Sequence, residues 1–149
     1  MKRLCKSIEL DEKLKGLFID LLNDLHGSGV PFRRKILFYV DEVNEKDIKE
    51  KLIKKENKNR FRIILATIIE GKKRHDLYGP EEISSKAKGV KAMKFTGGDR
   101  KNLRIYCKEY SIPGGSRIVM ANAYYKKSQK VNKELRENLE IIGGYEYEF

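Results

Sequence analysis

The sequence predicts an α+β fold in which N-terminal helices pack on a small twisted antiparallel β-sheet that precedes a C-terminal helix. Three observations support this prediction: helical spacing of apolar residues before about residue 75, alternation with period two from residue 90, and a last helical stripe near the C-terminus. We expect residues 1–149 to form a single domain, with a helical part over about 1–75 and a basic sheet and helix over about 90–149.

The first expected helix runs from about Asp11 to His26. Its apolar residues recur at helical spacing and define one core face: Leu10, Leu14, Leu17, Phe18, Leu21, Leu22 and Leu25. Asp11 and Glu12 suit the first turn, because the helix dipole favours negative charge there. Gly27 follows the last apolar residue and ends the helix.

The pattern is less decisive between residues 31 and 55. Phe32–Val40 is apolar, aromatic and β-branched after Pro31, which fits either a strand or a second helix. Asn44 or Asp47 can cap a very charged helix that reaches about Lys55.

A mostly buried helix is predicted over Phe61–Glu70, with Gly71 ending it. The next segment, Lys72–Gly89, contains Gly79-Pro80 and has little periodicity, so we expect a loop there.

Three later segments have the period and the β-branched and aromatic content of strands: Val90–Thr96, Leu103–Ile112 and Arg117–Lys126. Turn sequences at 97–99 and 113–115 separate them, which predicts an antiparallel meander. Val131–Ile142 has the apolar spacing of a final helix. The acidic and aromatic tail Tyr145–Phe149 fits a short edge strand, or a cover for the basic face.

Composition excludes several classes of protein. Apolar runs such as Ile36–Val40 are too short for a membrane helix, and no apolar segment follows the basic N-terminus, so we expect a cytoplasmic protein. Cys5 and Cys107 do not make a disulfide framework and are expected to be small buried residues. With His26 and His75 as the only histidines, we expect no metal site and no cofactor.

The positive charge is confined to one part of the chain. The formal net charge is +11, and the segment Lys86–Lys133 holds 13 of the 33 basic residues but only two of the 22 acidic ones. The rest of the chain is therefore balanced. A field focused in this way attracts a polyanion, and a phosphate backbone is the commonest such partner.

Cations and tyrosines alternate on the expected strands. Arg104, Tyr106 and Lys108 share one face of their strand. Arg104 and Arg117 open two strands that we expect a hairpin turn to place side by side. This row fits a nucleic-acid contact, but equally the ordinary solvent face of an amphipathic strand.

Such residues can cleave RNA without a metal, because RNA carries its own nucleophile, the ribose 2′-hydroxyl. Arginine binds phosphate oxygens in pairs. A lysine crowded by other cations loses its proton more easily and approaches a useful base. Tyrosine stacks on a base or donates a proton.

Two stretches carry a resemblance to a known family. They are Leu103-Arg104-Ile105-Tyr106 and, after the hairpin, Ala123-Tyr124-Tyr125-Lys126-Lys127-Ser128-Gln129-Lys130. Together they resemble the C-terminal signature of RelE/HigB-type toxins, over roughly Val90–Ile142. The resemblance implies a metal-independent, ribosome-associated mRNA endonuclease that is neutralised by an antitoxin from the same operon.

The resemblance also implies roles for individual residues. Arg104 corresponds to the strand arginine that binds phosphate, and Lys127, with Lys126, to the transition-state cation at the junction. Lys91 and Lys94 lie where the RelE branch has two strand lysines, but their spacing of three would turn them to opposite faces. That branch's late tyrosine has no counterpart near Val131, so Tyr124 or Tyr125 would substitute for it.

The strand pattern and the resemblance together give two sets of candidate residues. Those expected to be catalytic are Arg104, Lys127, Lys94 and Tyr125. Those expected to bind RNA are Lys91, Tyr106, Lys108, Arg117, Tyr124, Lys126 and Lys130. The expected partners are mRNA, the ribosome and a cognate antitoxin with an acidic segment over the basic face, without a membrane or a small-molecule cofactor.

Two alternatives remain open at this stage. One is a non-catalytic toxin or binding module of the same fold, such as a gyrase poison of the ParE branch or a ribosome binder. The other is a general RNA-binding protein that has no toxicity.

Overall fold

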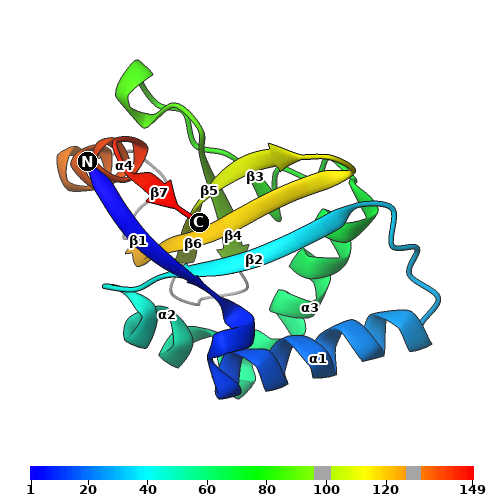
Figure 1. Ribbon diagram of the computed structural model, residues 1–149. Coiled ribbons are helices and arrows are strands. Elements are labelled where there is room, and N and C mark those ends of the chain that lie inside the picture. The colour runs from blue at the N-terminus through cyan, green and yellow to red at the C-terminus, as the bar shows by residue number, and fades with distance from the viewer. Residues whose placement is uncertain (96–101, 127–131) are drawn as a thin grey trace.

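The computed structural model describes residues 1–95, 102–126 and 132–149. Over these ranges the chain forms four α-helices and one curled, seven-stranded sheet, so the predicted α+β class is confirmed (Figure 1). The helices are α1 (Glu12–Gly27), α2 (Glu45–Leu52), α3 (Lys55–Glu70) and α4 (Lys133–Gly143). The strands are β1 (Lys2–Ser7), β2 (Lys35–Asp41), β3 (Tyr78–Pro80), β4 (Val90–Phe95), β5 (Asn102–Ile112), β6 (Gly115–Lys126) and β7 (Glu146–Glu148).

The sheet is larger than predicted, and it is mixed. Its strand order is β3-β4-β5-β6-β2-β1-β7. The meander β4-β5-β6 is antiparallel as predicted, but β2 pairs parallel to β6 and β7 pairs parallel to β1. The expectation of a small antiparallel sheet is therefore wrong, and the range 1–75 is not only helical. β2 matches the strand alternative for Phe32–Val40, whereas β1 was not predicted. β1 and β2 belong to that range, and both pair with the sheet.

The predicted helices are confirmed, but α3 begins at Lys55, six residues before the expected start at Phe61. Asp11 caps α1, because its carboxylate accepts a 3.0 Å hydrogen bond from the Leu14 N–H. Leu10, predicted to belong to the apolar face, is 74% exposed because it lies in a 3₁₀ turn ahead of the helix. Gly71 ends α3 at a positive φ of 76°, where a side chain would strain the backbone. The expected loop before β4 contains the short strand β3.

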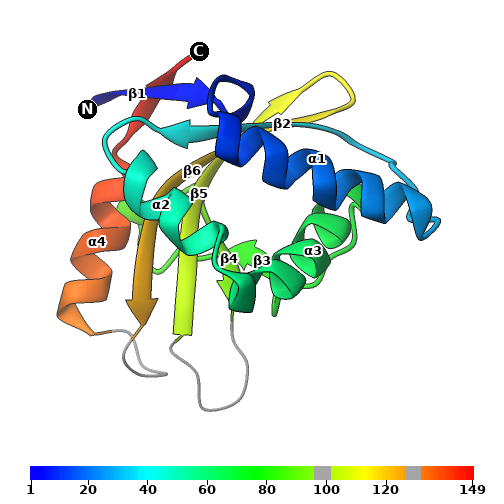
Figure 2. The ribbon, with the colours of Figure 1, turned by 90° about the horizontal axis from the view of Figure 1, so that it is seen from below.

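Two apolar layers cover the two faces of the sheet. α1, α2 and α3 lie on one face, and α4 lies on the other (Figure 2). We call the layer under α1, α2 and α3 the first core and the layer under α4 the second core. Side chains alternate along β5 between the two: Ile105 and Cys107 enter the first core, as expected, and Tyr106 enters the second. The second core forms because the apolar side chains on one side of α4 pack against this face of the sheet and are removed from water.

Both ends of the chain are tied to one buried carboxylate. Asp41, at the end of β2, is fully buried. Its Oδ2 accepts hydrogen bonds from Arg3 Nε at 2.8 Å and from the Tyr147 hydroxyl at 2.7 Å, and its Oδ1 accepts from the backbone of Val43 and Asn44. These bonds satisfy the carboxylate and hold β7 as the edge strand beside β1, as predicted for the tail.

Candidate functional site

Three cations lie on one face of the sheet, where β4 and β6 end and β5 begins. Lys94 pairs with Arg104 across β4 and β5, and Arg104 pairs with Tyr124 across β5 and β6. Cross-strand partners share a face of the sheet. Lys126 lies two residues beyond Tyr124 and so shares that face as well. We call Lys94, Arg104 and Lys126 the cation cluster.

Arg104 is the most buried member of the cluster. It is only 8% exposed, and its Nη1 donates a 3.3 Å hydrogen bond to the carbonyl of Leu103. Among the described residues, no carboxylate makes an ion pair with Arg104 or with Lys126. Burial lowers the pKa of the Arg104 guanidinium from its ordinary value. Among the described residues, one carboxylate therefore pairs with the cluster, and it does so through Lys94. The charges of Arg104 and Lys126 have no ion-pair partner there.

Crowding also affects Lys126. Burial, and then the positive charges of Arg104 and Lys94, lower the pKa of its ammonium group, while the carboxylate of Glu81 acts in the opposite direction. A lysine in this environment gives up a proton more readily than a lysine in water.

Glu81 is the carboxylate of this site, and the sequence reasoning missed it. Its Oε1 lies 3.2 Å from Lys94 Nζ. The backbone N–H of Glu81 donates a 2.8 Å hydrogen bond to the carbonyl of Val90, which fixes the residue directly after β3. The acidic pair Glu81-Glu82 ahead of the basic strands was the available signal, but a loop prediction gave it no place in the sheet.

Tyr106 forms the floor beneath the cluster and is not a surface residue. It is 1% exposed, and its ring centroid lies 6.2 Å from that of Tyr124. Burial raises the pKa of its hydroxyl, so the ring is neutral at physiological pH. The expected stacking of RNA on Tyr106 does not fit this position, because α4 and the second core cover the ring.

The two junction tyrosines point to opposite faces of the sheet. The Tyr124 hydroxyl approaches Glu134 Oε1 at 3.4 Å on the cluster side. Tyr125 packs against the first core, with Lys51 Nζ 5.5 Å from its ring centroid. Tyr124 therefore lies beside Arg104, and Tyr125, the expected catalytic tyrosine, does not.

Lys91 lies outside the cluster. It faces away from Lys94, as their spacing indicated, and its Nζ lies 3.1 Å from Glu109 Oε1. Glu109 also binds the Tyr78 hydroxyl at 2.8 Å and Arg34 at 3.2 Å. Lys91 thus belongs to an ion-pair network on the other face of the sheet, away from the cation cluster.

Lys108 and Arg117 are also held elsewhere. Lys108 Nζ donates a 2.8 Å hydrogen bond to the carbonyl of Gly143 at the end of α4. Arg117 pairs with Tyr110 near the hairpin turn, and its guanidinium carbon lies 4.6 Å from the Phe149 ring centroid. The two strands lie side by side, as expected, but Arg104 and Arg117 do not converge, because residues that open two antiparallel strands lie at opposite ends of the hairpin.

Lys127 and Lys130, predicted to act in catalysis and in RNA binding, lie outside the described residues.

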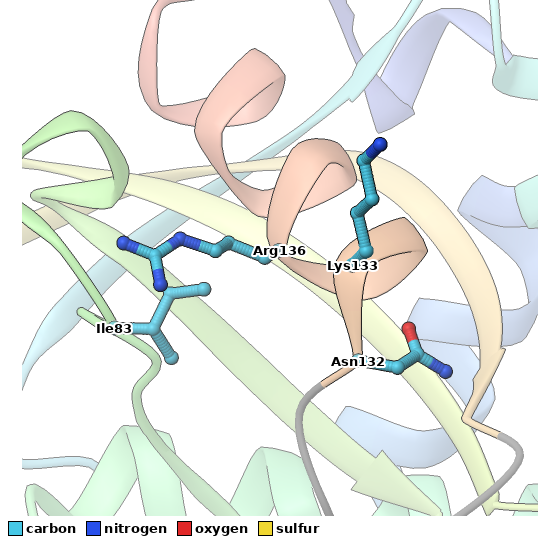
Figure 3. Close-up of a pocket in the computed structure, with 4 residues that line it drawn as sticks. All are labelled: Ile83, Asn132, Lys133 and Arg136. Atoms are coloured by element: carbon cyan, nitrogen blue, oxygen red, sulfur yellow. The ribbon is translucent and has the colours of Figure 1, made fainter.

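A surface hollow of about 530 Å³ adjoins the start of α4. It is lined by Ile83, Asn132, Lys133 and Arg136 (Figure 3). Ile83 lies two residues after Glu81, and Lys133 precedes Glu134, the partner of Tyr124.

Within the described ranges, no group of His, Cys, Asp and Glu side chains is arranged to hold a metal ion. No described helix combines the length and the apolar character needed to cross a membrane. Cys107 is buried and Cys5 is partly buried, and both are free thiols. Comparisons with family models, with curated proteins and with solved structures gave no match for this chain.

Proposed function

We propose that this protein is the toxin of a toxin–antitoxin pair of the RelE/HigB type, acting as a metal-independent mRNA endoribonuclease at the ribosome. The observation that carries the proposal is the convergence of Lys94, Arg104 and Lys126 on one face, with Glu81 beside them. Two of these residues belong to the stretches that resemble the family signature. The proposal places the protein in the cytoplasm, where its substrate is.

Cleavage begins with attack of the ribose 2′-oxygen on the neighbouring phosphorus. Arg104 binds the nonbridging phosphate oxygens, because a guanidinium fork matches their geometry and stays cationic. Lys94 adds a second positive charge from the adjacent strand. Each preorganised contact of this kind contributes about 3 kcal/mol at the transition state.

Two groups move protons. The Glu81 carboxylate accepts the proton of the 2′-hydroxyl as the new P–O bond forms. Lys126 donates a proton to the 5′-oxygen as the old P–O bond breaks, a step that its lowered pKa favours. The products are a 2′,3′-cyclic phosphate and a 5′-hydroxyl, so neither water nor a metal takes part in this step.

The positive charge of the cation cluster also indicates which partners the protein binds. RNA supplies the anion for Arg104 and Lys126, which form no ion pair among the described residues. An antitoxin neutralises the protein by laying an acidic segment across this face.

Brief induction in a bacterial host tests the proposal. Wild-type protein is expected to arrest growth and to create new transcript 5′ ends within codons. Arg104→Met and Lys126→Gln should abolish both effects. The matched control Arg117→Gln, on the same hairpin but at its other end, should keep them. Double-strand DNA breaks without new transcript ends would instead favour a gyrase poison, and harmless expression of the wild type would contradict the proposal.

A further inference from the structure

We propose that Arg60, on α3, is a positioning residue of the cation cluster, which holds the backbone of Lys94 so that its ammonium group stays beside Arg104. The inference rests on the proposed function and adds a residue to that site. Arg60 comes from a helix on the opposite face of the sheet, and neither the strand pattern nor the family resemblance assigned it a role.

Arg60 reaches the end of β4 because α3 lies beside β3 and β4 (Figure 2). Its Nε donates a 2.9 Å hydrogen bond to the carbonyl of Lys94, and its Nη2 donates a 3.3 Å hydrogen bond to the carbonyl of Asp76. Two nitrogens of one rigid guanidinium group therefore join α3 both to β4 and to the turn that precedes β3.

The carbonyl of Lys94 takes its donor from Arg60 because β3 does not supply one. The N–H of Lys94 donates to the carbonyl of Leu77 at 2.9 Å, as in a strand pair. In a longer antiparallel ladder the N–H of Leu77 would donate back to Lys94. It donates instead to the carbonyl of Arg74, also at 2.9 Å, in the turn before β3. Arg60 therefore completes the ladder at Lys94.

This bonding pattern brings the side chains of Lys94 and Arg104 together. The N–H and C=O of Lys94 are used on the side of β3 and Arg60, so Lys94 and Arg104 form a non-hydrogen-bonded pair across β4 and β5. Side chains lie closer in such pairs than in hydrogen-bonded pairs. Two cations at this separation repel each other. A bond that fixes the backbone at Lys94 opposes their separation.

The charge of Arg60 also acts on the cluster. Burial is the main cause that lowers the pKa of the Arg104 guanidinium, and the positive charge of Arg60 lowers it further. Arg60 therefore adds to the positive field in which a phosphate would bind. Its contribution has two parts that can be separated, the hydrogen bonds to the two carbonyls and the charge.

Arg60→Lys separates the two parts, because it keeps the charge and removes the rigid fork that joins both carbonyls. Affinity is measured with a fluorescent, single-stranded 2′-O-methyl RNA oligomer, in which the nucleophile is blocked. The variant should bind about fivefold more weakly than the wild type, the value of one lost hydrogen bond. Arg62→Lys, on the same helix and paired with Asp24, is the matched control and should bind as the wild type does.

A double-mutant cycle with Lys94→Gln shows whether Arg60 acts through Lys94. Adding Arg60→Lys to Lys94→Gln should change the affinity by less than about twofold, because the ammonium group that Arg60 positions is already gone. Circular dichroism shows that each variant is folded. An equal loss of affinity in both backgrounds, or wild-type affinity in Arg60→Lys, would overturn the inference. Coupling of the two residues in a protein that leaves ordinary RNA intact would support the inference and refute the nuclease.

Discussion

Lys94 and Arg104 are cross-strand partners, so two like charges lie side by side on one face of the sheet. Such a pair destabilises a sheet unless something else stabilises the positions. Glu81 partly offsets the repulsion through its contact with Lys94, and burial of Arg104 adds to the cost. Residues that cost stability at a shared location are typical of functional sites.

The first prediction concerns stability. Arg104→Met should leave the free energy of unfolding unchanged or raise it by about 1 kcal/mol, because it removes a buried charge that no described carboxylate pairs with. RNA cleavage should be lost at the same time. Chemical denaturation of the two proteins measures the effect.

Arg3→Met is the matched contrast, because the same substitution there removes the partner of the fully buried Asp41. It should lower the free energy of unfolding by about 3 kcal/mol. If Arg104→Met destabilised the protein as much as Arg3→Met does, the arginine would be a structural residue.

The second prediction concerns the pH dependence of cleavage. The rate should fall at alkaline pH as Lys126 loses its proton, below the pH at which an ordinary lysine titrates. Lys126→Gln should remove this alkaline limb of the profile, and Glu81→Gln should slow cleavage. An alkaline limb that Lys126→Gln leaves unchanged, or a rate that Glu81→Gln leaves unchanged, would exclude that group from proton transfer.

The third prediction concerns acid stability. Hydrogen bonds from Ser116 and Tyr78 and the charge of Lys91 outweigh the effect of burial and lower the pKa of Glu109 from 4.5 to about 2. A depressed folded pKa contributes stability that is present above the unfolded pKa and is lost as pH falls from about 5 to about 2. That contribution is about 3 kcal/mol at neutral pH.

Glu109→Gln should therefore lower the free energy of unfolding at neutral pH and flatten its decline in acid, as denaturation at a series of pH values would show. Asp20→Asn, an exposed change on α1, is the control. An equally steep acid decline in Glu109→Gln would contradict the prediction.

The fourth prediction concerns salt. Each cation that neutralises a phosphate of single-stranded RNA contributes about 0.7 to the slope of log affinity against log salt. Lys94→Gln and Lys126→Gln should each reduce the slope by roughly that amount, whereas Arg117→Gln should not. Titrations of the three variants with an uncleavable RNA oligomer at several salt concentrations measure these slopes. Equal slopes for all three variants would show that the cation cluster does not contact the RNA.

Much of the fold could be predicted because single segments carry their own pattern. The leucine stripe of α1, the glycine that ends α3 and the meander β4-β5-β6 are local signals, and the structure has all of them. β1 was missed because a short strand rich in lysine and arginine has no apolar alternation. Its place is set by Asp41 and Tyr147, which are distant in sequence.

The candidate site was predicted only in part, for a similar reason. The position of Arg104 on a strand could be read from the sequence, but whether its face meets solvent depends on α4. The apolar stripe of α4, with Leu135 and Leu139, needed a surface, and the alternate positions Val90, Ala92 and Tyr106 are apolar. Reading the two patterns together would have predicted that Tyr106 is buried.

The chemistry of the cut RNA ends tests the central claim most directly. Purified protein should be incubated with ribosomes that carry a defined mRNA, and the fragments analysed by mass. The account predicts 2′,3′-cyclic phosphate ends, no cleavage by Arg104→Met, and no cleavage where the scissile nucleotide is 2′-deoxy. Fragments with 5′-phosphate ends, or cutting of the 2′-deoxy substrate, would contradict it.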